Sequence, residues 1–251
     1  MTRIALIADI HSNVFALEAV LADISRRGVD HIINLGDVLY GPIAPRATLD
    51  VLDQRDDIIT ISGNQDRQIV SADDDELNAN ATLGFIHDEV GRAGIDWLKG
   101  LSREARLGEL YACHGSPGSD TCYLLEDVSF GWPRLREEKA IISSLAGESS
   151  SVVACAHTHI PRWVRLSNGQ CIVNPGSVGM PAYYDDQPVP HVMENHAPHA
   201  AYALIAGNGY SWQVEFFRIL YDHEEAARTA SMHGRDDWAY LLVNGCMPST
   251  D

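Results

Sequence analysis

The sequence predicts an α/β protein with a largely parallel sheet at its start and antiparallel strands farther along. Near the start, short apolar runs without alternation are each followed by a segment with helical spacing, as in βα units. Two later segments instead place Asn-Gly between strand-like runs, at Asn168-Gly169 and Asn208-Gly209, which is typical of β-hairpins. At 251 residues and 45% hydrophobic content the chain can bury a sizeable core, and we expect one main domain over residues 1–251.

The first 64 residues have the order β-α-β-α-β, which favours a parallel sheet with helices on its faces. Asn13 is suited to cap the first helix, and Gly28 is suited to end it. The apolar positions of that helix are Leu17, Val20, Leu21 and Ile24. The expected elements are a strand in 3–9, a helix over 13–28, a strand in 31–37, a helix over 45–55 and a strand in 57–64.

The rest of the chain continues with two more helix-to-strand units and two hairpins. Residues 181–200, rich in Pro, His and acids and without periodicity, predict a long surface loop, with a small cap or loop element over a site within 180–200. The C-terminal run 236–245 is apolar enough to pack back on the core. The expected elements are helices around 80–99 and 133–147, strands in 109–116 and 151–159, and hairpins over 163–177 and 200–219.

The charge balance excludes some classes of partner. With 18 Lys plus Arg against 35 Asp plus Glu, the net charge is −17, so the surface repels duplex nucleic acid and anionic membranes. The same surface tolerates bound cations. The five cysteines lack CxxC spacing, and the chain has no apolar run of signal-peptide or membrane-span length. We therefore expect a cytoplasmic protein with reduced thiols and no membrane partner.

Polar residues follow each strand-like run of the chain. In open α/β sheets, ligands bind beyond the carboxyl ends of the strands, so these side chains should converge. A mixed set of carboxylates, imidazoles and one amide suits Mn, Fe, Zn, Co or Ni better than Ca²⁺, which prefers oxygen ligands. Capping and turn formation are ordinary uses of Asp, but they do not explain why every donor follows a strand. The seven candidate ligands are Asp9, His11, Asp37, Asn64, His114, His157 and His159.

The motif order D-x-H, G-D, G-N-x-D, H-G and H-T-H, running from residue 9 to residue 159, resembles the calcineurin-like metallophosphoesterases, in particular the small bacterial phosphodiesterases. The resemblance implies two mixed β-sheets packed as a sandwich flanked by helices. It also implies two divalent metal ions, with Asp37 bridging them. In that scheme Asp9, His11 and His159 hold one metal, whereas Asn64, His114 and His157 hold the other.

The resemblance further implies hydrolysis of a small phosphodiester or nucleotide-type substrate, such as a dinucleoside polyphosphate, by a metal-bound hydroxide. The residues that it marks as catalytic are Asp37, Asn64, Asp66 and His114, and Asp66 is expected to orient a neighbouring ligand. Three alternatives stay open: a phosphomonoesterase, a protein phosphatase, and a non-catalytic interaction scaffold such as the retromer subunit of this fold. Intact ligand positions argue against the scaffold.

Two positions depart from the family pattern. Gln65 stands where many members have a His that is thought to protonate the leaving group, and an amide cannot deliver a proton. This substitution favours phosphodiesters, or esters with good leaving groups, over alkyl phosphomonoesters. Relatives often carry Gln-Pro-Arg where this chain has Met180-Pro181-Ala182. The histidines that could replace that Arg are His191, His196 and His199.

Overall fold

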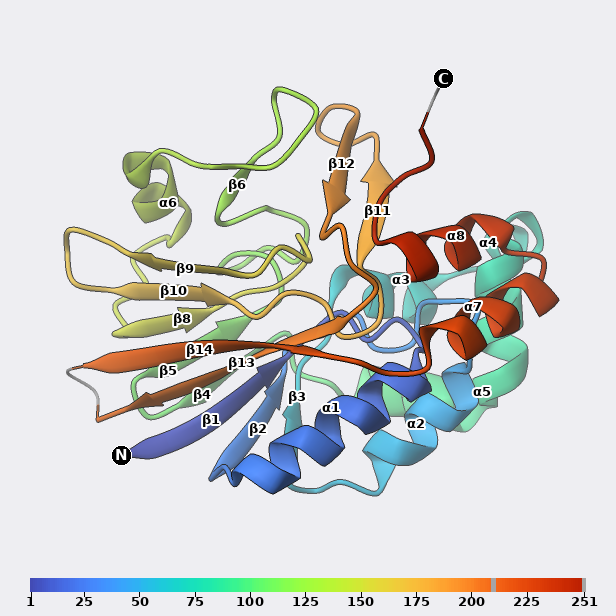
Figure 1. Ribbon diagram of the computed structural model, residues 1–251, viewed down its shortest axis with the longest axis horizontal. Coiled ribbons are helices and arrows are strands. Elements are labelled where there is room, and N and C mark those ends of the chain that lie inside the picture. The colour runs from blue at the N-terminus through green and yellow to red at the C-terminus, as the bar shows by residue number, and fades with distance from the viewer. Residues whose placement is uncertain (209–210, 250–251) are drawn as a thin grey trace.

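The computed structural model describes residues 1–208 and 211–249 and confirms the α/β class (Figure 1). Two five-stranded mixed sheets lie face to face, and helices flank the outer faces of both. We call them the first sheet, with strand order β14-β13-β1-β2-β3, and the second sheet, with order β4-β5-β8-β10-β9. This is the sandwich that the family resemblance implies.

Each sheet has two parallel and two antiparallel strand pairings. The strands of the first sheet are β1 (Thr2–Ile7), β2 (His31–Asn34), β3 (Ile58–Thr60), β13 (Ala200–Gly207) and β14 (Trp212–Ile219). The strands of the second sheet are β4 (Glu104–Leu107), β5 (Leu110–Cys113), β8 (Val152–Ala154), β9 (Arg162–Arg165) and β10 (Cys171–Asn174). Both predicted hairpins are antiparallel, although Gly209 of the second turn lies outside the described residues.

Side-chain alternation along the strands separates the inner core from the outer ones. On β1, Ile4 and Leu6 face the second sheet, whereas Ala5 and Ile7 face the helices. Both faces of the strand are therefore covered, and this explains its continuous apolar run. In Figure 1 helices α1 and α2 lie against the first sheet, and α6 lies against the second.

The predicted first helix is confirmed. Asn13 accepts a hydrogen bond from the Ala16 N–H at 3.1 Å, and Gly28 ends the helix with φ of 67°. All four predicted apolar positions of this helix are buried. The helices are α1 (Val14–Arg27), α2 (Pro45–Asp53), α3 (Asn64–Ser71), α4 (Asp74–Ala79), α5 (Ala81–Lys99), α6 (Glu138–Ser144), α7 (His223–Met232) and α8 (Asp236–Asn244).

Two sequence predictions are wrong. The loop predicted over residues 181–200 contains a hairpin of β11 (Ala182–Asp185) and β12 (His191–Glu194), because its buried positions alternate on either side of a proline-containing turn. The helix predicted over 133–147 is shorter, because its first residues pair as β7 (Arg134–Leu135) with β6 (Glu126–Asp127). Sheet pairing therefore decides the conformation in both places.

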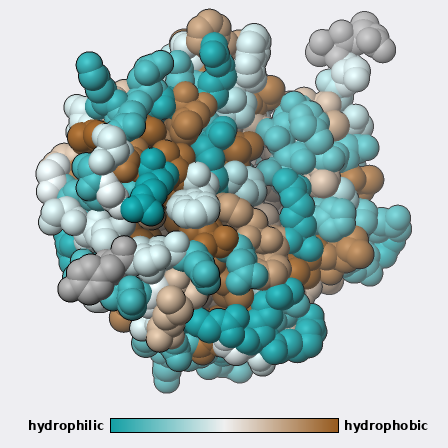
Figure 2. All heavy atoms as spheres, turned by 60° about the vertical axis from the view of Figure 1, so that its left-hand side comes forward, coloured by the Kyte–Doolittle hydropathy of each residue, from teal (hydrophilic) through white to brown (hydrophobic). Residues whose placement is uncertain are grey.

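The C-terminal helices α7 and α8 pack against each other and against the β11 side of the hairpin. Trp238, Leu241 and Leu242 of α8 are buried, which confirms that this run packs on the core. All five cysteines are free. Among the described residues, we find no helix that is both long and apolar enough for a membrane span. The face that Figure 2 turns forward exposes hydrophobic residues between hydrophilic ones.

Candidate metal centre

The seven predicted ligands lie together at the carboxyl ends of β1, β2, β3, β5 and β8, where the two sheets meet. Six of them form two clusters, and the ligand atoms within each cluster lie within 4.8 Å of one another. Each cluster draws on both sheets, so its geometry depends on how the sheets pack. The clusters are Asp9, His11 and His159, which we call the first cluster, and Asp37, His114 and His157, which we call the second cluster.

Backbone carbonyls orient three of the four histidines. In each, Nδ1 lies within hydrogen-bond distance of a backbone oxygen, which favours the proton on Nδ1 and leaves the Nε2 lone pair toward the cluster. Such a partner for the outer ring nitrogen is typical of metal-binding histidines. The pairs are His11 with Tyr40 at 2.9 Å, His114 with Leu35 at 2.8 Å, and His159 with Met180 at 2.8 Å.

The first cluster fits a divalent cation. Both carboxylate oxygens of Asp9 are buried and have no hydrogen-bond partner among the described residues, and burial raises the pKa of this carboxyl well above its usual range. His11 Nε2 lies 3.1 Å from His159 Nε2, and burial lowers the pKa of both imidazoles, so both are neutral. Two neutral nitrogens and an unpartnered carboxylate facing one point are the ligand chemistry that Mn, Fe, Co or Zn takes.

The second cluster carries the bridging candidate Asp37. His114 Nε2 lies 3.4 Å from Asp37 Oδ2 and 3.0 Å from Asn64 Oδ1, so the amide joins this cluster. Burial alone would raise the pKa of Asp37, but the His114 imidazole lowers it below its usual range. Burial together with the neighbouring His114 lowers the pKa of His157 to about 3, so that imidazole is neutral. The donor atoms of the second cluster therefore also suit a transition metal.

Strained backbone marks the loops that carry these ligands. A positive φ is uncommon for a non-glycine residue and costs about 1–3 kcal/mol, and such residues gather at functional sites. Loop-to-loop hydrogen bonds hold the strained backbone, for example from Asp9 N–H to the Gly36 oxygen at 2.9 Å and from His11 N–H to the Asp37 oxygen at 3.1 Å. The ligands with positive φ are Asp9 (53°), His11 (50°), Asp37 (53°), His157 (69°) and His159 (59°).

Two glycines let the loops after β2 and β3 approach each other. A Cβ on Gly63 would lie 2.1 Å from Asp37 Oδ1, and one on Gly36 would lie 2.4 Å from the Gly63 nitrogen. Because no real Cβ can be placed there, the residue before Asp37 and the residue before Asn64 must both be glycine. The same approach lets the Gln65 N–H donate to Asp37 Oδ1 at 2.9 Å.

Asp66 joins these two loops through their backbones. Its buried carboxylate accepts from the N–H groups of Val38 at 2.9 Å, Leu39 at 3.4 Å and Gly63 at 2.9 Å. Burial, followed by the nearby charge of Asp37, raises the pKa of Asp66 to about 6. With its oxygens occupied by backbone donors, Asp66 positions the loops that carry Asp37 and Asn64.

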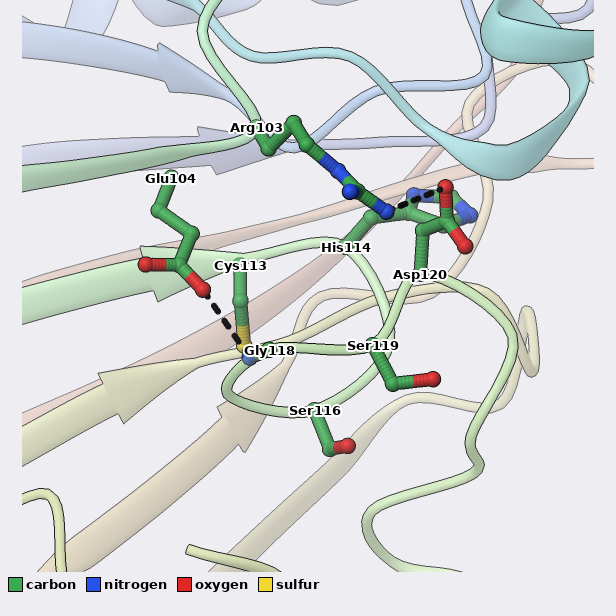
Figure 3. Close-up of a pocket in the computed structure, with 8 residues that line it drawn as sticks. All are labelled: Arg103, Glu104, Cys113, His114, Ser116, Gly118, Ser119 and Asp120. Carbon is green, nitrogen blue, oxygen red and sulfur yellow. Dashed lines mark hydrogen bonds and ion pairs between the residues drawn. The ribbon is translucent and has the colours of Figure 1, made fainter. Parts of the chain in front are cut away.

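The loop after β5 is tied to α3 beside His114. Asp120 accepts two hydrogen bonds from Arg67, at 2.6 and 3.0 Å, and Arg103 lies 3.3 Å from the same carboxylate. Gly118 N–H donates to Glu104 at 2.9 Å. Figure 3 shows Arg103, Glu104, Gly118 and Asp120 around a cavity of about 370 Å³ that also touches His114. Among the described residues that line this cavity, His114 is the one predicted ligand, so we assign the nearby ion pairs to holding His114 and α3 in place.

Sequence reasoning missed two tyrosines beside the clusters. Tyr183 on β11 donates to the His157 carbonyl at 3.0 Å, and its ring centroid lies 4.6 Å from that of His159. Tyr123 lies 3.1 Å from the Tyr183 hydroxyl, and its ring centroid lies 4.8 Å from that of His157. The signal of Tyr183 was obscured because residues 181–200 looked like a loop.

Two larger cavities open on the clusters. One of about 410 Å³ touches His11 and Asp37, one of about 820 Å³ extends past Tyr123, and they share Asn64, His157 and Asp185. The first cavity also contains Gln65 and Arg235.

Two of the three loop histidines suggested as substitutes for the missing Arg, His191 and His196, occupy other places. His191 Nε2 lies 3.0 Å from the Tyr123 hydroxyl, and its other ring nitrogen lies 2.7 Å from the Val189 carbonyl. His196 lies 3.8 Å from Glu194 on the surface. In the described part of the chain neither of these two histidines lines either cavity, whereas Arg235 does.

The chain is similar to known proteins in both sequence and structure. The chain is 38% identical over 107 residues to the uncharacterized protein MJ0912 of Methanocaldococcus jannaschii, an alignment that spans 42% of this chain and 40% of that protein. The crystal structure of a metallophosphoesterase from Sphaerobacter thermophilus superposes with a TM-score of 0.76 at 22% identity, covering 98% of this chain and 100% of that one. The model of the calcineurin-like phosphoesterase superfamily domain matches residues 2–195. This chain therefore belongs to the calcineurin-like phosphoesterase superfamily.

Proposed function

We propose that this chain hydrolyses phosphoesters with two divalent cations, and that small phosphodiesters or nucleotide-type esters are its preferred substrates. The observation that carries the proposal is the pair of adjacent ligand clusters, of which the first leaves the buried carboxylate of Asp9 without a hydrogen-bond partner among the described residues. A reducing, cytoplasmic setting fits the five free cysteines and forms part of the proposal.

In this proposal the first cluster holds one cation, and His114, His157 and Asn64 hold the other. Asp37, which belongs to the second cluster, would be the ligand shared by both cations. Two such cations, when bound, supply Lewis acidity for the attack of water on phosphorus and offset charge on the phosphoryl oxygens. The chain holds the ligands rigidly, through the carbonyls behind the imidazoles and through Asp66 behind the two loops.

The preference for diesters rests on Gln65. Its side chain lies in the cavity beside the clusters and can donate a hydrogen bond, but it has no proton to transfer to a poor leaving group. General-acid help is typically worth about 10²–10⁴-fold, so alkyl phosphomonoesters should be slow substrates.

The test is hydrolysis of bis(p-nitrophenyl) phosphate against p-nitrophenyl phosphate and glycerol phosphate, with Mn²⁺ added after stripping. We expect the diester to be cleaved fastest and glycerol phosphate slowest, with Asp37→Asn inactive on all three. Faster cleavage of both monoesters would replace the diesterase assignment with a phosphomonoesterase or a protein phosphatase. No cleavage despite bound Mn²⁺ would favour the non-catalytic scaffold.

A further inference from the structure

The cavity of about 410 Å³ is bounded on one side by the C-terminal part of the chain, and we call it the C-terminal cavity. Its floor is made of the ligand clusters, and β11 supplies a second side. The C-terminal side, which we call the wall, consists of residues on α8, just before it and after it: Arg235, Asp237, Trp238, Leu241, Met247 and Pro248. The wall lies beyond residue 195, where the match to the family model ends.

Two hydrogen bonds hold the wall to the end of β12 and the segment after it. Met247 N–H donates to the Glu194 side-chain carboxylate at 2.7 Å, and His196 N–H donates to the Gly245 carbonyl at 2.8 Å. A Cβ on Gly245 would lie 2.4 Å from the Ala197 nitrogen, so the two segments are in close contact. The segment that follows β12 therefore carries the wall, and the cavity is built before a ligand arrives.

The lining suits a flat ring with a polar edge. The Trp238 ring centroid lies 5.9 Å from that of His11, so the aromatic surface borders the first cluster directly. Tyr184 on β11 also lines the cavity, and 55% of its surface is exposed. Aromatic and apolar side chains with a few polar groups are typical of sites for planar organic ligands.

One polar group in the cavity lacks a partner. The Gln65 side-chain oxygen is buried, and among the described residues it accepts no hydrogen bond. An N–H or O–H donor of a ligand would satisfy it. A simple alkyl or aryl group would not provide such a donor, whereas a nucleoside would.

We propose that the C-terminal cavity binds the nucleoside part of a phosphoester whose phosphate lies on the ligand clusters, with Trp238 and Tyr184 as the residues that select a flat base. This inference rests on the proposed function and specifies its substrate class. It assigns the selection to one residue within the segment that matches the family model, Tyr184, and to one beyond it, Trp238.

The test compares the binding of adenosine 5′-monophosphate and ribose 5-phosphate to the Mn²⁺-loaded chain by isothermal titration calorimetry. The two ligands share the phosphate and the sugar and differ in the base. Base–aromatic stacking predicts that the wild type binds the adenosine compound at least about tenfold more tightly. Trp238→Ala and Tyr184→Ser should each reduce that ratio toward one, and Trp238→Phe should keep most of it. Trp163→Ala on the exposed β9 surface is the matched control and should leave the ratio unchanged.

Because Trp238 is only 7% exposed, its replacement by Ala can disturb folding, and the exposed Tyr184 provides a variant without that risk. An unchanged ratio in Tyr184→Ser and in a folded Trp238→Ala, with ribose 5-phosphate still bound, would overturn the inference and leave the proposed function intact. If the wild type bound neither compound and hydrolysed no ester, the proposed function itself would fail.

Discussion

The floor and the wall of the C-terminal cavity are built in different ways. The floor consists of buried polar groups on short loops, with strained backbone and with a carbonyl partner behind three of the four imidazoles. The wall consists mainly of apolar side chains on α8 and its C-terminal extension, beside the Arg235–Asp237 ion pair, and hydrogen bonds hold it to the end of β12 and the segment after it. Polar contacts hold the floor in a narrow geometry, whereas apolar packing holds the wall. In the function that we propose, the floor carries the chemistry, and the wall together with β11 selects the substrate.

The floor should respond most to loss of a ligand at the junction of the clusters. We expect Asp37→Asn to reduce diester turnover by about 10³-fold or more, because a metal centre of this kind contributes several kcal/mol of transition-state stabilisation. Steady-state hydrolysis of bis(p-nitrophenyl) phosphate measures it. Asp56→Asn, at an exposed position after α2, is the control and should retain full activity. Retention of more than a tenth of wild-type turnover in Asp37→Asn would show that Asp37 is not an essential metal ligand.

A backbone change beneath the ligands should act almost as strongly. In Gly63→Ala the added Cβ would lie 2.1 Å from Asp37 Oδ1, so the loops after β2 and β3 must separate. We expect about a 10²-fold loss of turnover, in line with the known sensitivity of catalysis to displacements of about 1 Å. Gly100→Ala, where the nearest atom would be 3.2 Å away, should be nearly neutral. Equal activity of the two variants would show that the close approach is unnecessary.

A positioning residue should have a smaller effect. Replacing Asp66 by Asn puts an N–H donor opposite backbone N–H groups, and support of this kind typically contributes about 10–100-fold to activity or metal affinity. We expect Asp66→Asn to lower turnover by a factor in that range and to weaken the Mn²⁺ affinity, which titration measures. Asp73→Asn, which changes the exposed cap of α4, should change neither quantity. Loss of turnover with unchanged Mn²⁺ affinity would place Asp66 in contact with substrate instead.

A change outside both regions should affect stability alone. Burial alone would raise the pKa of Asp23, but hydrogen bonds from Arg27, Tyr202 and Arg26 lower it to about 2, from 3.8. Since the folded pKa is depressed, the stabilisation is fully present above the unfolded pKa of 3.8 and is lost as the pH falls toward 2. We expect Asp23→Asn to lower the free energy of unfolding at pH 7 by on the order of 2 kcal/mol, with normal diester turnover.

Urea unfolding between pH 6 and pH 3 checks this prediction. The difference between wild type and Asp23→Asn should narrow as the pH falls, while Asp88→Asn on the exposed face of α5 should match the wild type throughout. A difference independent of pH would mean that packing around Tyr202, and not the charge of Asp23, stabilises the fold.

The sequence predicts the floor better than the wall, for a physical reason. Each ligand on the floor follows a buried strand directly, so a local pattern, an apolar run and then a polar residue, indicates its place. Asp9 and His114 are 105 positions apart and follow strands of different sheets, so their proximity also depends on how the two sheets pack face to face. The two glycines before Asp37 and Asn64 belong to the sequence motifs, but only the structure shows the atoms with which a Cβ at either position would clash.

The wall depends on contacts that leave no local pattern. Trp238 reads as a core residue of an amphipathic helix, and its position beside His11 follows from how α8 packs on β11. The β11–β12 hairpin was hidden because Pro188 and Pro190 mark a turn, while the strands on either side are only four residues long. Tyr183 was missed for the same reason.

The measurement that tests the central claim most directly is the number of Mn²⁺ ions bound per chain after equilibrium dialysis, determined by inductively coupled plasma mass spectrometry. The two ligand clusters predict two ions in the wild type, and loss of Asp9 in Asp9→Ala should reduce the number to about one. Fewer than one ion per wild-type chain, in a folded protein and at saturating Mn²⁺, would contradict the two-metal account.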